Sequence, residues 1–187
     1  MINDLLNHLL NHLGKNRFSP LNDNPKNLPD GPGVYIICTP SLECLPIQMG
    51  PLKYNILNGH YVIYVGIAGR PTSKKKSIRT RDYKNHFDGH ARGSTLRKSL
   101  GVLFDLRKRQ TLNEEGSTKF RFVQQDEAKL SNWMKENLLL YFFEMENPIE
   151  VEQQLIDYFN PPLNIKDNAN PVNIDFRKEL SGLRRLQ

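Results

Sequence analysis

Two short runs of β-branched and aromatic residues, GVYIICT at 33–39 and HYVIYVGI at 60–67, decide the fold of this chain. Side chains of this kind favour strands because they pack well on a pleated surface. Tyr35 and Tyr64 stand at equivalent places in the two runs. Strands paired in matching register would put both phenols on one face of a sheet. We therefore expect two central strands that carry a pair of tyrosines.

The segments around the first run predict a helix, a connector and a long insertion. Residues 2–13 place six aliphatic side chains on one broad arc of a helix. Residues 14–32 contain four prolines, which interrupt regular structure, and this pattern predicts a connector. Residues 40–59 contain three more prolines and two glycines, so a long excursion is expected between the two strands.

The second half of the chain predicts further helices and strands in mixed order. Ser94 is a natural N-cap, and Asn147 followed by Pro148 and Glu150 is typical of a capped helix start. The absence of regular βαβ repetition favours an α+β sheet flanked by helices. Helices are expected over 77–86, from 94 to about 110, over 126–137, 148–159 and 176–187, with strands at the end of 111–123 and over 138–145.

Composition excludes several classes of protein. A chain of 187 residues with 38% hydrophobic residues suits one domain with its own core. The longest uninterrupted hydrophobic run, residues 138–143, is far shorter than the roughly 20 residues that cross a bilayer. The opening MINDLLNHLL lacks the basic start and cleavage site of a secretory signal, so we expect a cytoplasmic protein without a membrane partner. Cys38 and Cys44 have the spacing of neither a disulfide framework nor a zinc site.

The positive charge is concentrated in one part of the chain. Residues 70–109 hold thirteen Lys or Arg against three Asp, a net charge of +10, whereas the total is +6. The rest of the chain is therefore mildly acidic. This asymmetry favours a face that binds a phosphate-rich partner, and a solvated surface with a flexible basic loop is the simpler alternative.

Residues with catalytic chemistry follow the second strand. Arg79, Tyr83 and His86 are spaced i, i+4 and i+7, so in an α-helix they share a face while Arg81 points elsewhere. An arginine, a phenol and an imidazole are suited to holding a phosphate and moving protons. Glu152 lies in the first turn of a predicted helix, where the helix terminus favours its ionised form. An ionised carboxylate is the ligand that a hard divalent cation needs.

These features, in this order, resemble the GIY-YIG nuclease superfamily over about residues 31–165. The matching elements are Gly33-Val34-Tyr35, Tyr64-Val65-Gly66, the basic helix, Glu152-x-x-Leu155-Ile156 and Pro161-Pro162-Leu163-Asn164. The resemblance implies a small three-stranded antiparallel sheet flanked by helices and metal-dependent cleavage of DNA. The two tyrosines are 29 residues apart, so 40–59 resembles the insertion of restriction-type members.

The same resemblance implies a role for each candidate residue. Glu152 is expected to bind Mg²⁺ or Mn²⁺, and Tyr35 or Tyr64 to help activate the attacking water. His86 is expected beside the arginine, and Asn164 is expected to support the site from the loop after the glutamate helix.

The catalytic arginine stays open between Arg79 and Arg81. The α-helical phase favours Arg79, which is four residues before Tyr83. The local pattern, an apolar Ile78 followed three residues later by an arginine, favours Arg81.

We thus expect a nuclease domain at 31–165, an N-terminal helix and connector at 1–30, and a helical extension at 166–187. The predicted partner is double-stranded DNA, with a homodimer left open. The alternatives are a restriction enzyme, a repair or mobile-element nuclease, and a catalytically silent DNA-binding module. A hypothesis outside nucleic-acid binding is a protein that binds a partner through its terminal helices. The predicted DNA contacts are Lys74, Lys75, Lys76, Lys84, Arg92, Ser94, Arg97 and Lys98.

Overall fold

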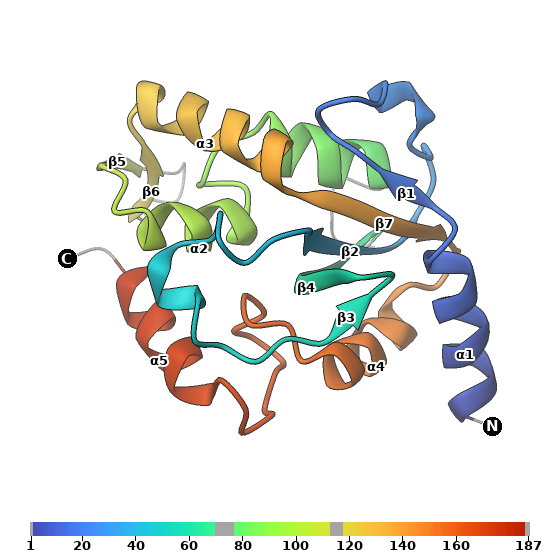
Figure 1. The fold of residues 1–187 in the computed structure, drawn as a ribbon. Coiled ribbons are helices and arrows are strands. Elements are labelled where there is room, and N and C mark those ends of the chain that lie inside the picture. The colour runs from blue at the N-terminus through green and yellow to red at the C-terminus, as the bar shows by residue number, and fades with distance from the viewer. Residues whose placement is uncertain (1, 70–76, 113–117, 186–187) are drawn as a thin grey trace.

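The computed structural model describes residues 2–69, 77–112 and 118–185, and its centre is an antiparallel sheet with the order β1-β7-β2-β4-β3 (Figure 1). The α+β class is confirmed, but the sheet has five strands and not three. The three expected strands form its middle, and two-residue strands extend it on both sides. The bounds are β1 (Arg17–Phe18), β2 (Gly33–Thr39), β3 (Ile56–Leu57), β4 (His60–Ala68) and β7 (Leu139–Glu144).

The two short edge strands come from segments that the sequence assigned to a connector and an insertion. β1 pairs with β7 through Arg17 opposite Tyr141. β3 and β4 form a hairpin whose turn is Asn58-Gly59, with φ of 48° and 79°. Asn-Gly is the preferred pair for a two-residue hairpin turn because both positions need positive φ. This signal was present in the sequence and predicts the short strand.

A bulge in β4 changes which side of the sheet the first residues of this strand face. Ile37 lies opposite Tyr64, whereas Cys38 lies opposite Val62, so Ile63 is the extra residue. A bulge shifts the alternation of the strand by one residue. As a result Ile63 and Tyr64 both belong to the core on one side of the sheet, while Val62 faces the other side.

Helices cover both faces of the sheet (Figure 1). The amphipathic helix α1 (Ile2–Leu13) and α4 (Ile149–Phe159) pack on one face, where the buried Leu9 and Leu13 meet Val34 and Ile36. The other core contains Tyr35 and Ile37 and packs against η3 (Arg79–Phe87), α2 (Thr95–Leu103) and α3 (Gln124–Asn137). The remaining elements are α5 (Ile174–Leu183), which contacts α2, and the 3-10 turns η1 (Pro25–Asn27) and η2 (Ile47–Met49).

The predicted helix from Ser94 to about 110 is shorter than expected. Ser94 is the N-cap, and its hydroxyl accepts from the Arg97 amide at 3.1 Å, as predicted. The helix ends at Leu103, and Asp105 takes a left-handed conformation with φ of 54°. Residues Lys108–Leu112 form β5, which pairs with β6 (Thr118–Phe122) in a second, two-stranded sheet. Pairing with a strand that buries Phe120 and Phe122 outweighs local helix propensity here.

The start of α4 also differs by one residue. Pro148 is the N-cap, and no side chain caps the helix, so the capping role predicted for Asn147 is wrong. The carbonyl of Pro148 accepts the first helical bond from the Glu152 amide at 3.1 Å. Glu152 nevertheless lies in the first turn, where the positive end of the helix favours a carboxylate.

A buried ion pair joins the helices on the site side of the sheet. Arg97 is fully buried, and its Nη2 donates to Glu127 Oε2 at 2.7 Å. Arg97 Nη1 donates to the carbonyl of His86 at 3.0 Å, which holds the end of η3. Glu127 Oε1 accepts from the amides of Ala91 and Phe122 at 2.8 and 3.0 Å. One guanidinium and one carboxylate thus connect η3, α2, α3 and β6.

Replacing Glu127 by Gln should lower the free energy of unfolding by about 3 kcal/mol or more, because it leaves the buried Arg97 charge without its counterion. Urea denaturation measures the difference. Glu136→Gln, at an exposed position on the same helix, is the control and should stay within about 0.5 kcal/mol of the native protein. A loss below about 1 kcal/mol for Glu127→Gln would contradict the role given to this pair.

Candidate active site

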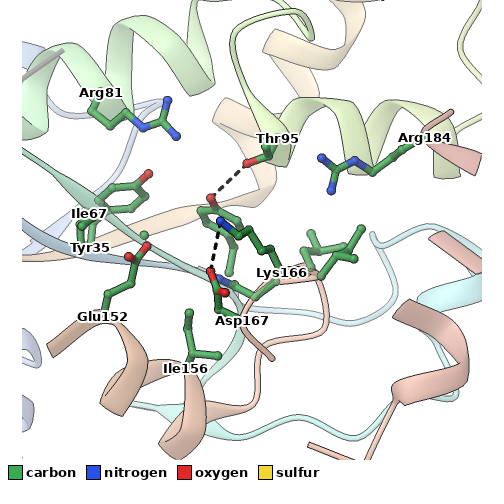
Figure 2. Close-up of a pocket in the computed structure, with 14 residues that line it drawn as sticks. Tyr35, Ile67, Arg81, Thr95, Glu152, Ile156, Lys166, Asp167 and Arg184 are labelled. Carbon is green, nitrogen blue, oxygen red and sulfur yellow. Dashed lines mark hydrogen bonds and ion pairs between the residues drawn. The ribbon is translucent and has the colours of Figure 1, made fainter. Parts of the chain in front are cut away.

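A pocket of about 340 Å³ opens where the central strands meet α4, η3 and the start of α2 (Figure 2). It gathers polar side chains that are far apart in the sequence. Tyr35 comes from β2, Tyr64 from β4, Arg81 from η3 and Glu152 from α4. Figure 2 shows Arg81, Tyr35 and Glu152 turned toward one another on one side of the pocket. The other lining residues are Gly66, Ile67, Thr95, Ile156, Leu163, Asn164, Ile165, Lys166, Asp167 and Arg184.

The two tyrosines lie on the same face, as the sequence predicts. Their ring centroids are 6.3 Å apart. Tyr35 is paired with Gly66 across the two strands, and its ring lies over that glycine. A Cβ atom at residue 66 would lie 2.5 Å from both Cζ and Oη of Tyr35. Glycine is therefore needed at this position to leave space for the Tyr35 ring.

His86 links Tyr35 to the N-cap of α2 in a buried chain of hydrogen bonds. Its Nε2 is 2.8 Å from Tyr35 Oη, and its Nδ1 is 2.6 Å from Ser94 Oγ. His86 is fully buried and Ser94 nearly so. Since each of the three groups can donate or accept, a shift of tautomer at His86 moves a proton along the chain. Ser94 thus supports the histidine as well as capping α2.

The helix that carries Arg81 and His86 is a π-helix, which changes the spacing of its faces. Its hydrogen bonds run between residues five apart, as in the bond from the Asp88 amide to the Tyr83 carbonyl at 3.1 Å. Arg81 and His86 are five apart and both reach the Tyr35 region. The α-helical spacing that grouped Arg79, Tyr83 and His86 does not apply here, so that grouping is wrong.

Arg79 serves a structural purpose on another side of η3. Its Nη2 donates to the carbonyl of Leu28 at 2.7 Å, and its Nη1 lies 3.6 Å from Asp30 Oδ2. The guanidinium therefore holds the connector before β2. Of the two arginines left open by the sequence, Arg81 is the one that lines the pocket.

Two carboxylates line the pocket, Glu152 and Asp167. Glu152 is half-buried in the first turn of α4, and Asp167 follows in the loop after that helix. No group of three or more His, Cys, Asp or Glu side chains able to hold a metal occurs in the described part of the chain. Hard oxygen donors of this kind suit Mg²⁺ or Mn²⁺, and Mg²⁺ usually binds one or two carboxylates and keeps several waters.

Asn164 fastens the loop after α4 to the edge of β4. Its Oδ1 accepts from the Val65 amide and its Nδ2 donates to the Val65 carbonyl, both at 2.9 Å. The Leu163 amide donates to the Ile63 carbonyl at 3.1 Å. Because β3 pairs only with residues 60 and 61, these contacts satisfy strand groups that β3 does not reach. They also place the loop beside Tyr64.

Four polar side chains of the pocket were not among the site residues predicted from the sequence: Thr95, Lys166, Asp167 and Arg184. The Thr95 hydroxyl is 3.2 Å from that of Tyr64, and Lys166 is 4.0 Å from the Asp167 carboxylate. Lys166 and Asp167 lie two and three residues after Asn164 of the Pro-Pro-Leu-Asn segment, and this closeness in sequence could have indicated them. No local pattern indicated Arg184, which reaches the pocket from the end of α5.

The predicted DNA contacts fall into three groups. Lys84 and Arg92 are exposed, and Lys98 is half-buried. Ser94 and Arg97 are buried and bonded inside the protein, so neither has a surface for the predicted phosphate contact, and their roles are structural. Lys74, Lys75 and Lys76 lie outside the described residues.

Comparison with protein families identifies the class to which this arrangement belongs. The GIY-YIG catalytic domain matches residues 33–186. The chain is a member of the GIY-YIG family, and this membership places it among the nucleases. Searches of curated proteins and of solved structures gave no significant match. Within the described residues, none of the helices has the length and apolar character needed to span a bilayer.

Replacing Asn164 by Ala should free the loop from β4 and lower the free energy of unfolding by about 2 kcal/mol, since two buried backbone groups lose their partners. Hydrogen exchange should show the Val65 amide exchanging faster. Asn147→Ala, at an exposed position before α4, should leave both quantities unchanged. Unaltered protection of Val65 in Asn164→Ala would rule out the anchoring role.

Proposed function

We propose that this protein is a magnesium-dependent endonuclease that hydrolyses phosphodiester bonds in double-stranded DNA. The observation that carries the proposal is the convergence of Tyr35, Tyr64, Arg81 and Glu152 on one pocket from four different elements. An arginine, a carboxylate and hydroxyl groups are the side chains that phosphate-ester hydrolysis requires.

Glu152, with Asp167 across the same pocket, would hold the metal. The bound ion would supply charge neutralisation at the scissile phosphate and the leaving oxygen. The hard oxygen donors of the two carboxylates fit Mg²⁺ or Mn²⁺.

Arg81 binds the equatorial oxygens of the scissile phosphate in this mechanism. A guanidinium keeps its proton at every physiological pH and matches phosphate with two parallel donors. The charge that grows on these oxygens in the transition state strengthens the interaction, which therefore accelerates the reaction.

Tyr35 is the group that we propose to orient and deprotonate the attacking water. With a proton on His86 Nδ1 directed at Ser94, His86 Nε2 accepts the proton of the Tyr35 hydroxyl at 2.8 Å. The Tyr64 hydroxyl forms a hydrogen bond with the Thr95 hydroxyl, which is a much weaker proton acceptor than the imidazole of His86. We therefore assign proton transfer to Tyr35 and orientation of the substrate to Tyr64.

A restriction-type role is the form of this activity that we favour. The segment 40–59 contributes the edge strand β3 and the turn η2, and the C-terminal α5 brings a further arginine to the pocket. We propose that these segments read the DNA sequence. Cuts mapped to one short sequence would support restriction, whereas cuts at particular DNA structures would support repair or mobile-element function. A cytoplasmic location and, for cleavage of both strands, a homodimer are part of the same proposal.

Glu152→Gln should abolish nicking and cutting of plasmid DNA in magnesium, because the amide is a poor metal ligand. Gel electrophoresis of the plasmid measures both products. Glu150→Gln, an exposed change in the same helix turn, should cut at the native rate. An inactive native protein that still binds DNA would favour the catalytically silent module instead.

Single substitutions of Arg81 and Arg79 distinguish an arginine that acts in catalysis from one that stabilises the fold. Arg81→Gln should slow cleavage by about 100-fold or more with little change in stability, because the phosphate loses its main donor. Arg79→Gln should lower the free energy of unfolding by about 1 kcal/mol through lost contacts with the connector and keep most of the cleavage rate. Rates measured at saturating DNA, with urea denaturation of both variants, decide the assignment. The reverse pattern would make Arg79 the catalytic arginine.

A further inference from the structure

A second pocket of about 440 Å³ adjoins the candidate active site on the side away from Arg81. It is lined by Lys98 of α2, Lys166 of the loop after α4, and Ser181, Arg184 and Arg185 at the end of α5, with Ile165. Ile165, Lys166 and Arg184 line both pockets. The second pocket thus has four cationic side chains and no carboxylate in its wall.

Arg184 is the residue that connects the two pockets. Figure 2 shows its guanidinium pointing toward the active-site pocket from the side opposite Arg81. Among the described residues its side chain makes no hydrogen bond or ion pair. The side chain is half-buried, and this burial lowers the pKa of the guanidinium below its usual range, while the nearby Tyr64 opposes the change. A cation withdrawn from water without a counterion is costly unless an anion binds beside it.

The neighbouring Lys98 is also a partly buried cation. Its Nζ lies 5.2 Å from the centre of the Phe120 ring. Its pKa is lowered first by burial, and then by the charges of Arg184 and Lys119. The two cations therefore repel each other in a pocket that lacks an acidic side chain, and a bound anion would relieve the repulsion.

The backbone that carries Arg184 is held in place by another basic residue. Lys108 of β5 donates from Nζ to the carbonyls of Leu183 and Arg185, at 2.8 and 3.1 Å. The Arg184 amide also donates to the Leu180 carbonyl at 3.1 Å. These contacts fix the end of α5, so Arg184 is directed at the pocket from a supported position.

We propose that Arg184, Lys98 and Lys166 form a second phosphate subsite, which binds the phosphate next to the scissile one on the same nucleic-acid strand. This inference rests on the proposed nuclease function of the first pocket. Successive phosphates of one strand are joined through a single nucleoside, so two anion sites in adjoining pockets match a continuous strand. Arg81 then holds the strand at the scissile phosphate and Arg184 holds it at the neighbouring one.

The first test measures DNA binding by fluorescence anisotropy with a 12-base-pair duplex in magnesium. Every protein carries Glu152→Gln so that the duplex stays intact. Arg184→Gln should weaken binding by about tenfold and reduce the slope of log affinity against log salt by about one, since one phosphate contact is lost. Lys98→Gln should act in the same direction, and Arg184→Lys should recover part of the affinity because it keeps the charge. Lys178→Gln, an exposed change on the same helix, should bind within about twofold of its parent.

The second test identifies the phosphate. In duplexes cut at a mapped position by the active protein, the neighbouring phosphate is replaced by a neutral methylphosphonate. The protein that keeps Arg184 should lose about tenfold in affinity when this phosphate is neutralised, and the Arg184→Gln protein should lose less than twofold. The methylphosphonate and the Arg184→Gln substitution remove the same contact, so their effects should not add.

The outcomes separate this inference from the proposed function. DNA cleavage by the native protein together with unchanged binding by Arg184→Gln would overturn the subsite and leave the nuclease proposal standing. Absence of cleavage with the predicted loss of binding in Arg184→Gln would overturn the nuclease proposal and the assignment to a phosphate next to a scissile one, and would leave a phosphate contact in a silent DNA-binding module. A lowered thermal unfolding midpoint in Arg184→Gln with unchanged affinity would show that Arg184 acts only on the end of α5, and would overturn the subsite.

Discussion

The buried ion pair between Arg97 and Glu127 is the interaction on which the geometry of the site depends. It lies in the interior, where two charges are tolerated only when their remaining donors and acceptors are satisfied. Arg97 uses its other donors on the carbonyls of His86 and Phe87 and on the Ser131 hydroxyl. The same guanidinium therefore fixes the end of η3, where His86 is located, and the start of α2, where Ser94 supports that histidine. Arg97, which the charge pattern assigned to DNA binding, is instead buried behind the candidate active site, where it supports the packing of η3 and α2.

Strand register and two departures from regular secondary structure shape the candidate site. Regular alternation from Gly66 to Tyr64 puts Tyr64 on the face of Tyr35, and Gly66 leaves space for the Tyr35 ring. The bulge adds Ile63 to the core on the same side. The π-helical turn of η3 aligns residues five apart, so that Arg81 and His86 serve one pocket. Irregularities of both kinds are frequent next to functional sites because they change the direction of a few side chains while the surrounding elements stay regular.

The predictable parts of this fold are those with strong local signals. The two tyrosine strands, the amphipathic helix over 2–13 and the Ser94 cap depend on propensities and hydrogen bonds within a few residues, and all three are confirmed. The prediction that the helix from Ser94 continues to about residue 110 was wrong, because residues 108–112 pair with β6, which lies outside the segment that suggested the helix. A local pattern does not include the packing that Phe120 and Phe122 gain in the second sheet.

The sequence by itself determined the order of the central strands and helices, the family, and five of the polar residues that line the pocket. Motif residues carry this information because their types and spacing follow from the chemistry that they perform. Only the tertiary structure placed Arg81, and not Arg79, at the pocket. It also moved Arg97 and Ser94 from the predicted DNA surface to the interior and brought Arg184 to the pocket. These outcomes depend on the phase of a π-helix and on contacts between residues far apart in the chain. Charge and local periodicity are properties of short segments, and neither specifies which side chains are withdrawn from water when the helices pack.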